Sequence, residues 1–182
     1  MRALTSLHAT LFSPIERADW LLPTVARFLF AAVLLMYFWV SGLTKLDGGP
    51  FSLSFGGYAQ IFPKAMEAVG YDITQLASWQ HVVVYAGTYS EFILPILIVI
   101  GLLTRLAALG MIGFVVVQSL TDLFAHGALA DPKVFGAWFD KASDSLIMDQ
   151  RSLWVLLLLI LVIKGAGPLS FDRALSPKNS NT

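Results

Sequence analysis

The sequence contains no cysteine, and only 13% of its 182 residues are charged. Without cysteine, the chain cannot form a disulfide, a thiol relay or a thiolate-bound metal site of its own. Its 12 basic and 12 acidic residues cancel, so the charge balance gives no reason to expect a nucleic-acid partner. The three histidines, His8, His81 and His126, do not form the matched pair that a transmembrane haem requires, and we expect no metal site.

Long apolar runs take the place of charge. Hydrophobic residues make up 57% of the chain, and soluble domains carry about twice its share of charged residues. Residues 1–23 do not read as a cleavable signal sequence, because His8 and Pro14 interrupt the apolar stretch and Glu16 and Asp19 follow it. The composition therefore predicts an integral membrane protein.

Four segments are candidates for crossing a bilayer, which takes about 20 helical residues, and the first three meet that length by their apolar residues. Only Thr104 and Arg105 separate the second segment from the third, so these two must form an antiparallel hairpin. We expect an all-α, four-helix transmembrane bundle in a single domain over residues 1–175, with a disordered tail over 176–182. The predicted spans are about 27–45, 82–104, 106–125 and 149–167.

The fourth span is ambiguous in the sequence. Its apolar core, Leu153–Ile163, has eleven residues and covers only about 16 Å of a core about 30 Å thick. The helix must either extend through residues 165–169 or draw Asp149 and Arg151 into the membrane, where the two could pair. The sequence leaves both alternatives open.

The other two connections are long, from about Leu46 to His81 and from about His126 to Arg151. Each contains a segment that mixes apolar and charged residues, Pro63–Val69 in the first and Val134–Lys141 in the second. Such a mixture is typical of a short helix lying in the membrane interface. Seven lysines and arginines fall on the side of the termini and the hairpin turn, against five on the side of the long loops. The positive-inside rule then predicts cytoplasmic N and C termini and two long extracytoplasmic loops.

Glu91 is the most informative residue of the chain. It lies near the middle of the second span and is the only formally charged group between Val82 and Leu103. A carboxylate at that depth is costly, so it is usually paired, protonated or placed in a polar cavity, and it is functional by default. We therefore take Glu91 as the candidate catalytic residue. Pro95, four residues on, removes a backbone hydrogen bond to the carbonyl of Glu91 and can kink the helix there.

Four further residues are candidates for ligand binding in the outer half of the bundle. Gln118 and Asp122 are four residues apart and share a helix face, Lys45 ends the first span, and Tyr89 lies on the outer side of Glu91. We expect Lys45 or Arg151 to be the partner of Glu91, in a pocket that takes a polar or quinone-like head group.

Each of these candidates also has a simpler interpretation. Lys45 at a helix end is most often an interfacial anchor, and Asp122 can be a solvated end residue. A glutamine placed like Gln118 more often makes a hydrogen bond between helices than a contact with a ligand. We expect structural roles for the remaining polar, glycine and proline positions of note, which are Ser41, Gly42, Pro95, Gly165, Gly167 and Asp172.

The sequence resembles the DoxX family of small four-helix membrane proteins, through three pieces in order. Arg27 opens the first span, which closes with Ser41-Gly42-Leu43-Thr44-Lys45-Leu46. Glu91 begins a run that ends Ile100-Gly101-Leu102-Leu103-Thr104-Arg105-Leu106-Ala107-Ala108. The last span ends in Gly165-Ala166-Gly167-Pro168-Leu169-Ser170-Phe171-Asp172, like the family's Gly-x-Gly-x-x-Ser-x-Asp ending. The order and spacing of these pieces cover residues 27–173.

This resemblance implies a multi-pass protein of the bacterial inner membrane with a link to redox and sulfur metabolism. Some members of the family form the membrane part of a thiosulfate:quinone oxidoreductase, and others associate with superoxide dismutase and a sulfurtransferase. We expect no covalently bound cofactor, quinone as the candidate cofactor, and the lipid bilayer and other membrane or redox polypeptides as partners. The leading hypothesis is a quinone-linked redox membrane subunit, and the alternative is a non-catalytic accessory or assembly subunit of a larger membrane complex. Whether the chain is an enzyme at all stays open.

Overall fold

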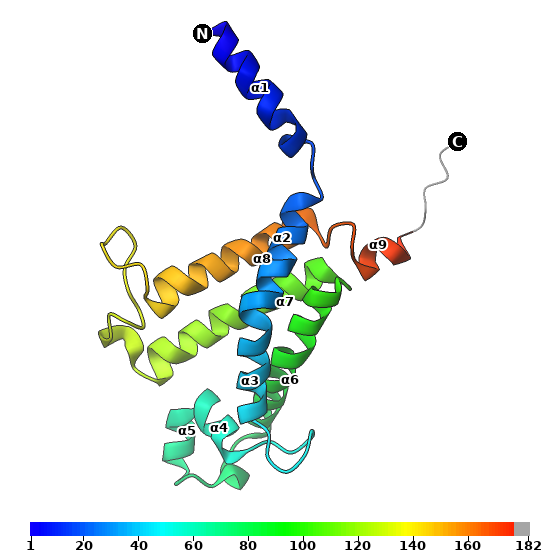
Figure 1. Cartoon of the computed structure of the whole chain (residues 1–182). Coiled ribbons are helices and arrows are strands. Elements are labelled where there is room, and N and C mark those ends of the chain that lie inside the picture. Colours follow the sequence, from blue (N-terminus) through cyan, green and yellow to red (C-terminus); the bar gives the residue numbers. More distant parts are fainter. Residues whose placement is uncertain (177–182) are drawn as a thin grey trace.

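The computed structural model describes residues 1–176 and is helical throughout, with a single isolated β-bridge between Leu46 and Leu53 and no strand in that range. Four of its helices are long and apolar enough to cross a membrane (Figure 1). This confirms the expected all-α fold with four candidate spans. Most of the predicted tail, from residue 177 on, lies outside the described residues. The candidate spans are Leu21–Thr44, Ser78–Ile100, Thr104–Ala125 and Leu146–Lys164.

The spans pack in a ring, each against two neighbours. The first span consists of α2 (Leu21–Phe30), the π-helical turn η1 (Ala31–Leu35) and α3 (Met36–Thr44), and it packs against both α6 (Ser78–Ile100) and α8 (Ser152–Lys164). The third span begins with α7 (Thr104–Leu120), which packs against the same two helices. We call the end with the turn between α6 and α7 the hairpin end, and the opposite end, with the two long connections, the long-loop end.

The first span keeps one stripe of side chains in the core. Ala26, Phe30, Leu34 and Phe38 are all buried and recur every four residues. In a regular α-helix, a spacing of four would rotate the stripe by about 40° at each step. The wider turn of η1 takes up about one extra residue, and the stripe therefore stays on the core side.

Span boundaries differ from the sequence prediction where a charged side chain turned out to be internal. The first span begins at Leu21 rather than near residue 27, because Arg27 is bonded inside the hairpin end and does not mark a membrane surface. The fourth span begins at Leu146, in the π-helical segment η5 (Leu146–Arg151), and ends at Lys164 before Gly165, whose φ is +80°. Of the two alternatives for this span, the helix therefore includes Asp149 and Arg151.

Arg27 ties three segments together at the hairpin end. Its guanidinium donates to Ile98 O at 3.1 Å and Val99 O at 2.6 Å, which are carbonyls of the last turn of α6. It also donates to Ala166 O at 2.8 Å and Leu169 O at 2.5 Å in the segment after α8. The last carbonyls of a helix lack a regular partner within the helix. Arg27 satisfies Val99 O, shares Ile98 O with the amide of Gly101, and fixes the chain that follows α8.

Asp172, far along the sequence, caps the start of α7. Its carboxylate accepts from Leu103 N at 2.7 Å and Thr104 N at 2.9 Å, the first amides of α7, and its own amide donates to Gly101 O at 2.8 Å. Gly101 adopts a left-handed φ of +72°, and a Cβ on it would lie 2.6 Å from Ser170 Cβ. The Gly-x-Gly-x-x-Ser-x-Asp ending therefore works as a clamp on the α6–α7 turn.

Asp172→Asn is expected to lower the free energy of unfolding by about 1 kcal/mol, since the amide keeps one acceptor and loses the charge. Burial alone would raise the pKa of Asp172, but the hydrogen bonds from Thr104 and Leu103 and the charge of Arg27 together lower it. Because the pKa of Asp172 is lower in the folded protein than its unfolded value of about 3.9, the ionised carboxylate stabilises the fold fully above that pH. This stabilisation is lost as the pH falls through the pKa of the folded protein. Melting curves in detergent should show the difference between the two proteins shrinking below about pH 4. A difference that stays constant into acid would contradict the capping role.

The long connections agree with the sequence prediction only in part. The helix expected over Pro63–Val69 is present as α5 (Pro63–Ala68), preceded by α4 (Phe55–Ile61). The prediction of a helix over Val134–Lys141 is wrong. That segment is a series of turns, because Gly136 and Phe139 have φ values of +74° and +66°, outside the helical region. The second connection holds only the one-turn helix η4 (Ala128–Ala130) before η5.

Candidate functional site

Glu91 lies on the inner face of α6 and is paired with Lys45. The buried residues of α6 alternate in steps of four and three, which turns one face towards the bundle, and Glu91 is the middle member of that stripe. Lys45 Nζ lies 2.8 Å from Glu91 Oε2 and 3.1 Å from Oε1. Both groups are buried, with 6% of Lys45 and 2% of Glu91 exposed. Of the two partners expected for Glu91, the structure selects Lys45 and not Arg151.

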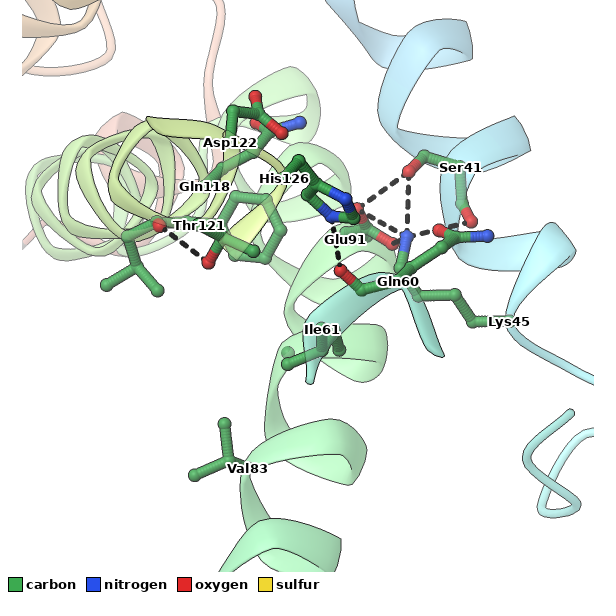
Figure 2. Close-up of a pocket in the computed structure, with 13 residues that line it drawn as sticks. Ser41, Lys45, Gln60, Ile61, Val83, Glu91, Gln118, Thr121, Asp122 and His126 are labelled. Atoms are coloured by element: carbon green, nitrogen blue, oxygen red, sulfur yellow. Dashed lines mark hydrogen bonds and ion pairs between the residues drawn. The ribbon is translucent and has the colours of Figure 1, made fainter. Parts of the chain in front are cut away.

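Ser41 completes the polar contacts of this pair. Its hydroxyl donates to Glu91 Oε1 at 2.8 Å and accepts from Lys45 Nζ at 2.9 Å, and its carbonyl accepts from the same ammonium at 3.1 Å. Figure 2 shows the three side chains converging between α3 and α6. Lys45 directly follows α3 in helical conformation and lies four residues after Ser41, so the end of this helix presents both to Glu91. A buried ion pair needs such additional hydrogen bonds to offset the desolvation of its charges.

Gly42 allows this close approach of α3 and α6. A Cβ built on Gly42 would lie 2.5 Å from the ring of Phe92, the residue next to Glu91. Gly42 is therefore a close-packing position, as the sequence suggested. The helix α6 continues unbroken through Pro95, which is buried on the same stripe as Glu91.

A second ion pair joins the third and fourth spans. Arg151 Nη2 lies 2.7 Å from Asp122 Oδ2, and Arg151 Nη1 donates to Ser119 Oγ at 3.0 Å. Arg151 is only 3% exposed, whereas the Asp122 side chain is 26% exposed. Asp149 is not the partner of Arg151: its carboxylate accepts from the amide and the hydroxyl of Ser145 and caps the start of η5.

Both members of this second pair lie in π-helical segments. Asp122 belongs to η3 (Thr121–Ala125), which continues α7, and Arg151 ends η5, which leads into α8. A π-helical turn changes the direction of the side chains that follow it and occurs often at functional sites. The two turns therefore set where the carboxylate and the guanidinium meet across the interface of the two spans.

A pocket of about 250 Å³ lies beside the two ion pairs, towards the long-loop end. Among the residues predicted from sequence, Glu91, Lys45, Gln118 and Asp122 all line it. It also has an apolar wall, so one side offers polar groups and the other offers hydrophobic contact (Figure 2). The remaining lining residues are Ser41, Gln60, Ile61, Val83, Gly87, Phe114, Val117, Thr121 and His126.

The first long connection contacts the end of the third span beside this pocket. His126, just after η3, makes a 2.9 Å hydrogen bond through Nε2 with Gln60 O in α4. Lys64 in α5 donates to Phe124 O at 2.8 Å. Both contacts join the first connection to the end of the third span. His126, which the sequence gave no reason to single out, therefore lines the pocket and joins the first connection to the third span.

Tyr89 is the one predicted ligand-binding residue that does not line the pocket. Its hydroxyl donates to Pro50 O, and the neighbouring Tyr85 hydroxyl donates to Phe51 O at 3.3 Å. The two rings stack with centroids 6.3 Å apart. Both tyrosines therefore hold the loop between α3 and α4 against the outer side of α6.

Two buried polar groups near the first ion pair have no hydrogen-bond partner among the described residues. Thr88 Oγ1 lies one turn from Glu91 on the same stripe, and Gln118 Oε1 belongs to an amide whose Nε2 donates to Tyr37 Oη at 3.1 Å. An unpaired buried polar atom costs free energy, so it usually finds a water or a ligand. Whichever way the amide of Gln118 is turned, one of its two polar atoms remains for such a partner.

The site can hold a small molecule that carries both polar groups and an apolar surface. The oxygens of Glu91 and Asp122 and the amide of Gln118 supply hydrogen-bonding groups, and the ammonium of Lys45 supplies positive charge. The apolar wall of Ile61, Val83, Phe114 and Val117 supplies packing surface. A pocket with a few convergent polar groups on a largely apolar wall is the usual form of a small-molecule site.

Comparison with known proteins gives one match. The model of the DoxX family matches residues 22–127, which is more than half of the chain. This stretch contains the first three spans and with them Ser41, Lys45, Glu91, Gln118 and Asp122, and it ends before the fourth span and the clamp of residues 165–172. No curated protein and no solved structure matches the chain.

Proposed function

The chain belongs to the DoxX family, and on that premise we propose that it is a quinone-linked redox subunit of a membrane complex. Its pocket would bind the quinone head group, with Glu91 as hydrogen-bond partner of the ring or as acceptor of the proton that the reduced form releases when it is oxidised. Lys45 and Gln118 would donate to the carbonyl oxygens of the ring, and Asp122 would accept from the hydroxyls of its reduced form. The observation that carries the proposal is the pocket itself, with ionisable groups on one side and an apolar wall on the other.

The residues present suit a quinone. Its carbonyl oxygens accept hydrogen bonds and the hydroxyls of its reduced form also donate them, so it needs both kinds of partner. The pocket offers the acceptors Glu91 and Asp122 and the unpartnered atom of Gln118, and Lys45 can donate where a quinone oxygen takes the place of one of its present acceptors. Reduction of a quinone takes two electrons and two protons. Because the sequence has no thiol, the electrons would come from a substrate or from another polypeptide.

We further propose that the protein lies in the bacterial inner membrane with both termini and the hairpin end in the cytoplasm. Seven lysines and arginines belong to the hairpin side and five to the long-loop side. Arg27, Lys45 and Arg151 are engaged inside the bundle. Without these three, six remain on the hairpin side and three on the long-loop side, which strengthens the bias that the positive-inside rule uses. In this orientation the pocket lies near the extracytoplasmic side.

Filling the pocket with a side chain tests quinone binding without touching an ion pair. Gly87 lines the pocket, and a Cβ there would meet only Ile61 Cδ1, at 3.6 Å. We expect Gly87→Leu to weaken binding of a short-tailed quinone by at least about tenfold, which corresponds to about 1.4 kcal/mol. Binding would be measured by titration of the purified protein in detergent, followed by tryptophan fluorescence.

Gly113→Leu is the matched control, because it is also a helix glycine and a Cβ on it meets nothing within 4 Å. This variant should bind quinone as the unaltered protein does. Equal affinities for all three proteins would remove the pocket from quinone binding. A redox role requires in addition that bound quinone become reduced when a sulfur donor is added, and failure with every donor tested would leave no role in electron transfer.

The alternative is a non-catalytic accessory or assembly subunit, and the saturation of the first ion pair favours it. Lys45 already donates to both oxygens of Glu91 and to both oxygens of Ser41, so the pair can act purely as a structural element of the bundle. Purification in mild detergent separates the two functions. A stoichiometric complex that keeps its activity when Gly87→Leu has abolished quinone binding would establish the accessory role.

A further inference from the structure

The N-terminal helix α1 (Arg2–Glu16) has one apolar and one polar face. Leu7, Leu11 and Ile15 follow one another at intervals of four residues, which places them along one side of the helix. Phe12 borders the same side, and the exposed fractions of the four side chains range from 45% for Phe12 to 60% for Leu11. The opposite side carries Ser6, Thr10 and Ser13.

None of the four apolar side chains of α1 belongs to a core cluster of the described structure. Figure 1 shows α1 (blue) apart from the four packed spans, beyond the end where the turn between α6 and α7 lies. An amphipathic helix with an unburied apolar face needs a nonpolar surface to lie on. The question is which surface the rest of the chain places beside it.

The linker that follows α1 holds the helix close to the membrane surface. Only residues 17–20 separate Glu16 from Leu21, the first residue of the first span. Four residues reach at most about 14 Å. Asp19 in this linker pairs with Lys164 at the end of α8, at 3.2 Å. Trp20 is 55% exposed and stands where an interfacial aromatic residue is expected. The C-terminal end of α1 is thus fixed at the level where two spans leave the bilayer.

The short helix α9 (Phe171–Leu175) marks the same level on another side of the bundle. Phe171 and Leu175 are four residues apart and expose 55% and 69% of their surface, and Leu169 just before them exposes 78%. Asp172, between them in sequence, is turned to the clamp. Two separate segments at the hairpin end therefore present apolar faces that the protein does not cover.

The polar face of α1 defines the chemistry of the surface that it fits. Helices drawn to anionic lipid carry lysine and arginine along the polar face, whereas the arginines of this segment stand only at the two ends of the helix, Arg2 at its first residue and Arg17 just after its last. The hydroxyls of serine and threonine and the carboxylate of Glu16 give no attraction to negative charge. Binding through such a helix depends on the apolar side chains entering the boundary between head groups and acyl chains.

We propose that α1 is an in-plane membrane anchor, lying on the leaflet at the hairpin end with Leu7, Leu11 and Ile15 inserted among the lipids. Its partner is the lipid surface itself, recognised through its acyl region and not through head-group charge. The anchor fixes the N-terminal segment flat against the membrane beside the first and fourth spans. It works independently of the pocket and of any ligand bound there.

The absence of cysteine makes a direct test simple, because each single-cysteine variant carries one spin label. Leu11→Cys places the label on the apolar face, and Ser13→Cys places it on the polar face two residues away. Phe28→Cys, on the exposed side of the first span, and Lys141→Cys, in the second long loop, are the lipid and water references. The full chain is reconstituted in nanodiscs of phosphatidylcholine, alone or mixed with phosphatidylglycerol.

Collision of the label with oxygen, which concentrates in lipid, is compared with collision with a water-soluble nickel complex. We expect the Leu11 label to behave like the Phe28 label and the Ser13 label to behave like the Lys141 label, in both lipid mixtures and at high salt. Nickel access to the Leu11 label equal to that of the Ser13 label would overturn the proposal. So would insertion that appears only with phosphatidylglycerol, or a Leu11 label hidden from both reagents and coupled to a label on a second copy.

Discussion

Glu91→Leu is expected to lower the free energy of unfolding by about 3–5 kcal/mol, because it leaves the ammonium of Lys45 buried without its counter-charge. The two groups are almost fully buried and 2.8 Å apart, so the ammonium loses its counter-charge while it stays largely shielded from bulk solvent. Unfolding would be followed in mixed micelles with a denaturing detergent. Lys45→Met alone should cost a similar amount, for the converse reason.

The double variant Lys45→Met with Glu91→Leu distinguishes pairing from simple loss of contacts. It removes both charges together, so we expect its stability to lie within about 1.5 kcal/mol of the unaltered protein and well above either single variant. The exposed pair of Lys164 and Asp19 is the matched control. Lys164→Met should change stability by less than about 1 kcal/mol. Additive losses in the buried pair would show that the two residues do not stabilise each other.

Arg27→Met should destabilise the protein by at least about 3 kcal/mol, since four carbonyl groups lose a charged hydrogen-bond donor at once. Arg27→Lys keeps the charge, but a single ammonium cannot reproduce the fork that reaches both the end of α6 and the segment after α8. Its loss should therefore be intermediate. The same unfolding assay measures both variants.

Arg105→Met is the control for Arg27, because Arg105 is an exposed arginine at the same end of the bundle. Its replacement should stay within about 0.5 kcal/mol of the unaltered protein. Equal effects of the two arginine variants would mean that Arg27 acts only as a surface charge, which is how the sequence alone presented it.

The sequence predicted the elements that depend on local pattern. Apolar length located the first three spans and the core of the fourth, and a lone acid within such a run marked Glu91 as a residue that must have a partner. The spacing of Gln118 and Asp122 correctly placed both on one face, because helical periodicity is a local property. The helix at Pro63 was also visible, since proline at a first helical position is a local signal.

The features that sequence reasoning missed depend on contacts between distant residues. The sequence analysis took the charge of Arg27 to mark the edge of the first span, and it left open whether Arg151 lies inside the membrane. In the structure, both side chains are bonded inside the protein. The π-helical turns at Asp122 and Arg151 give no periodic signal over five or six residues. Tyr89 lies at the depth expected of a ligand contact, but its hydroxyl is committed to a loop carbonyl. A usable signal did exist for Arg151. The apolar core of the fourth span is too short to cross the membrane, so the neighbouring arginine must lie inside the bundle and needs an acidic partner there.

The clamp made by residues 165–172 has a consequence for biosynthesis. These residues leave the ribosome after all four spans, so the nascent chain inserts its helices while the amides of Leu103 and Thr104 still lack the carboxylate of Asp172. A chain that terminates at Lys164 has every segment needed for insertion and none of the groups that close the turn. Closure of the turn is therefore a late step of assembly, and a product truncated at Lys164 keeps an open turn at the hairpin end.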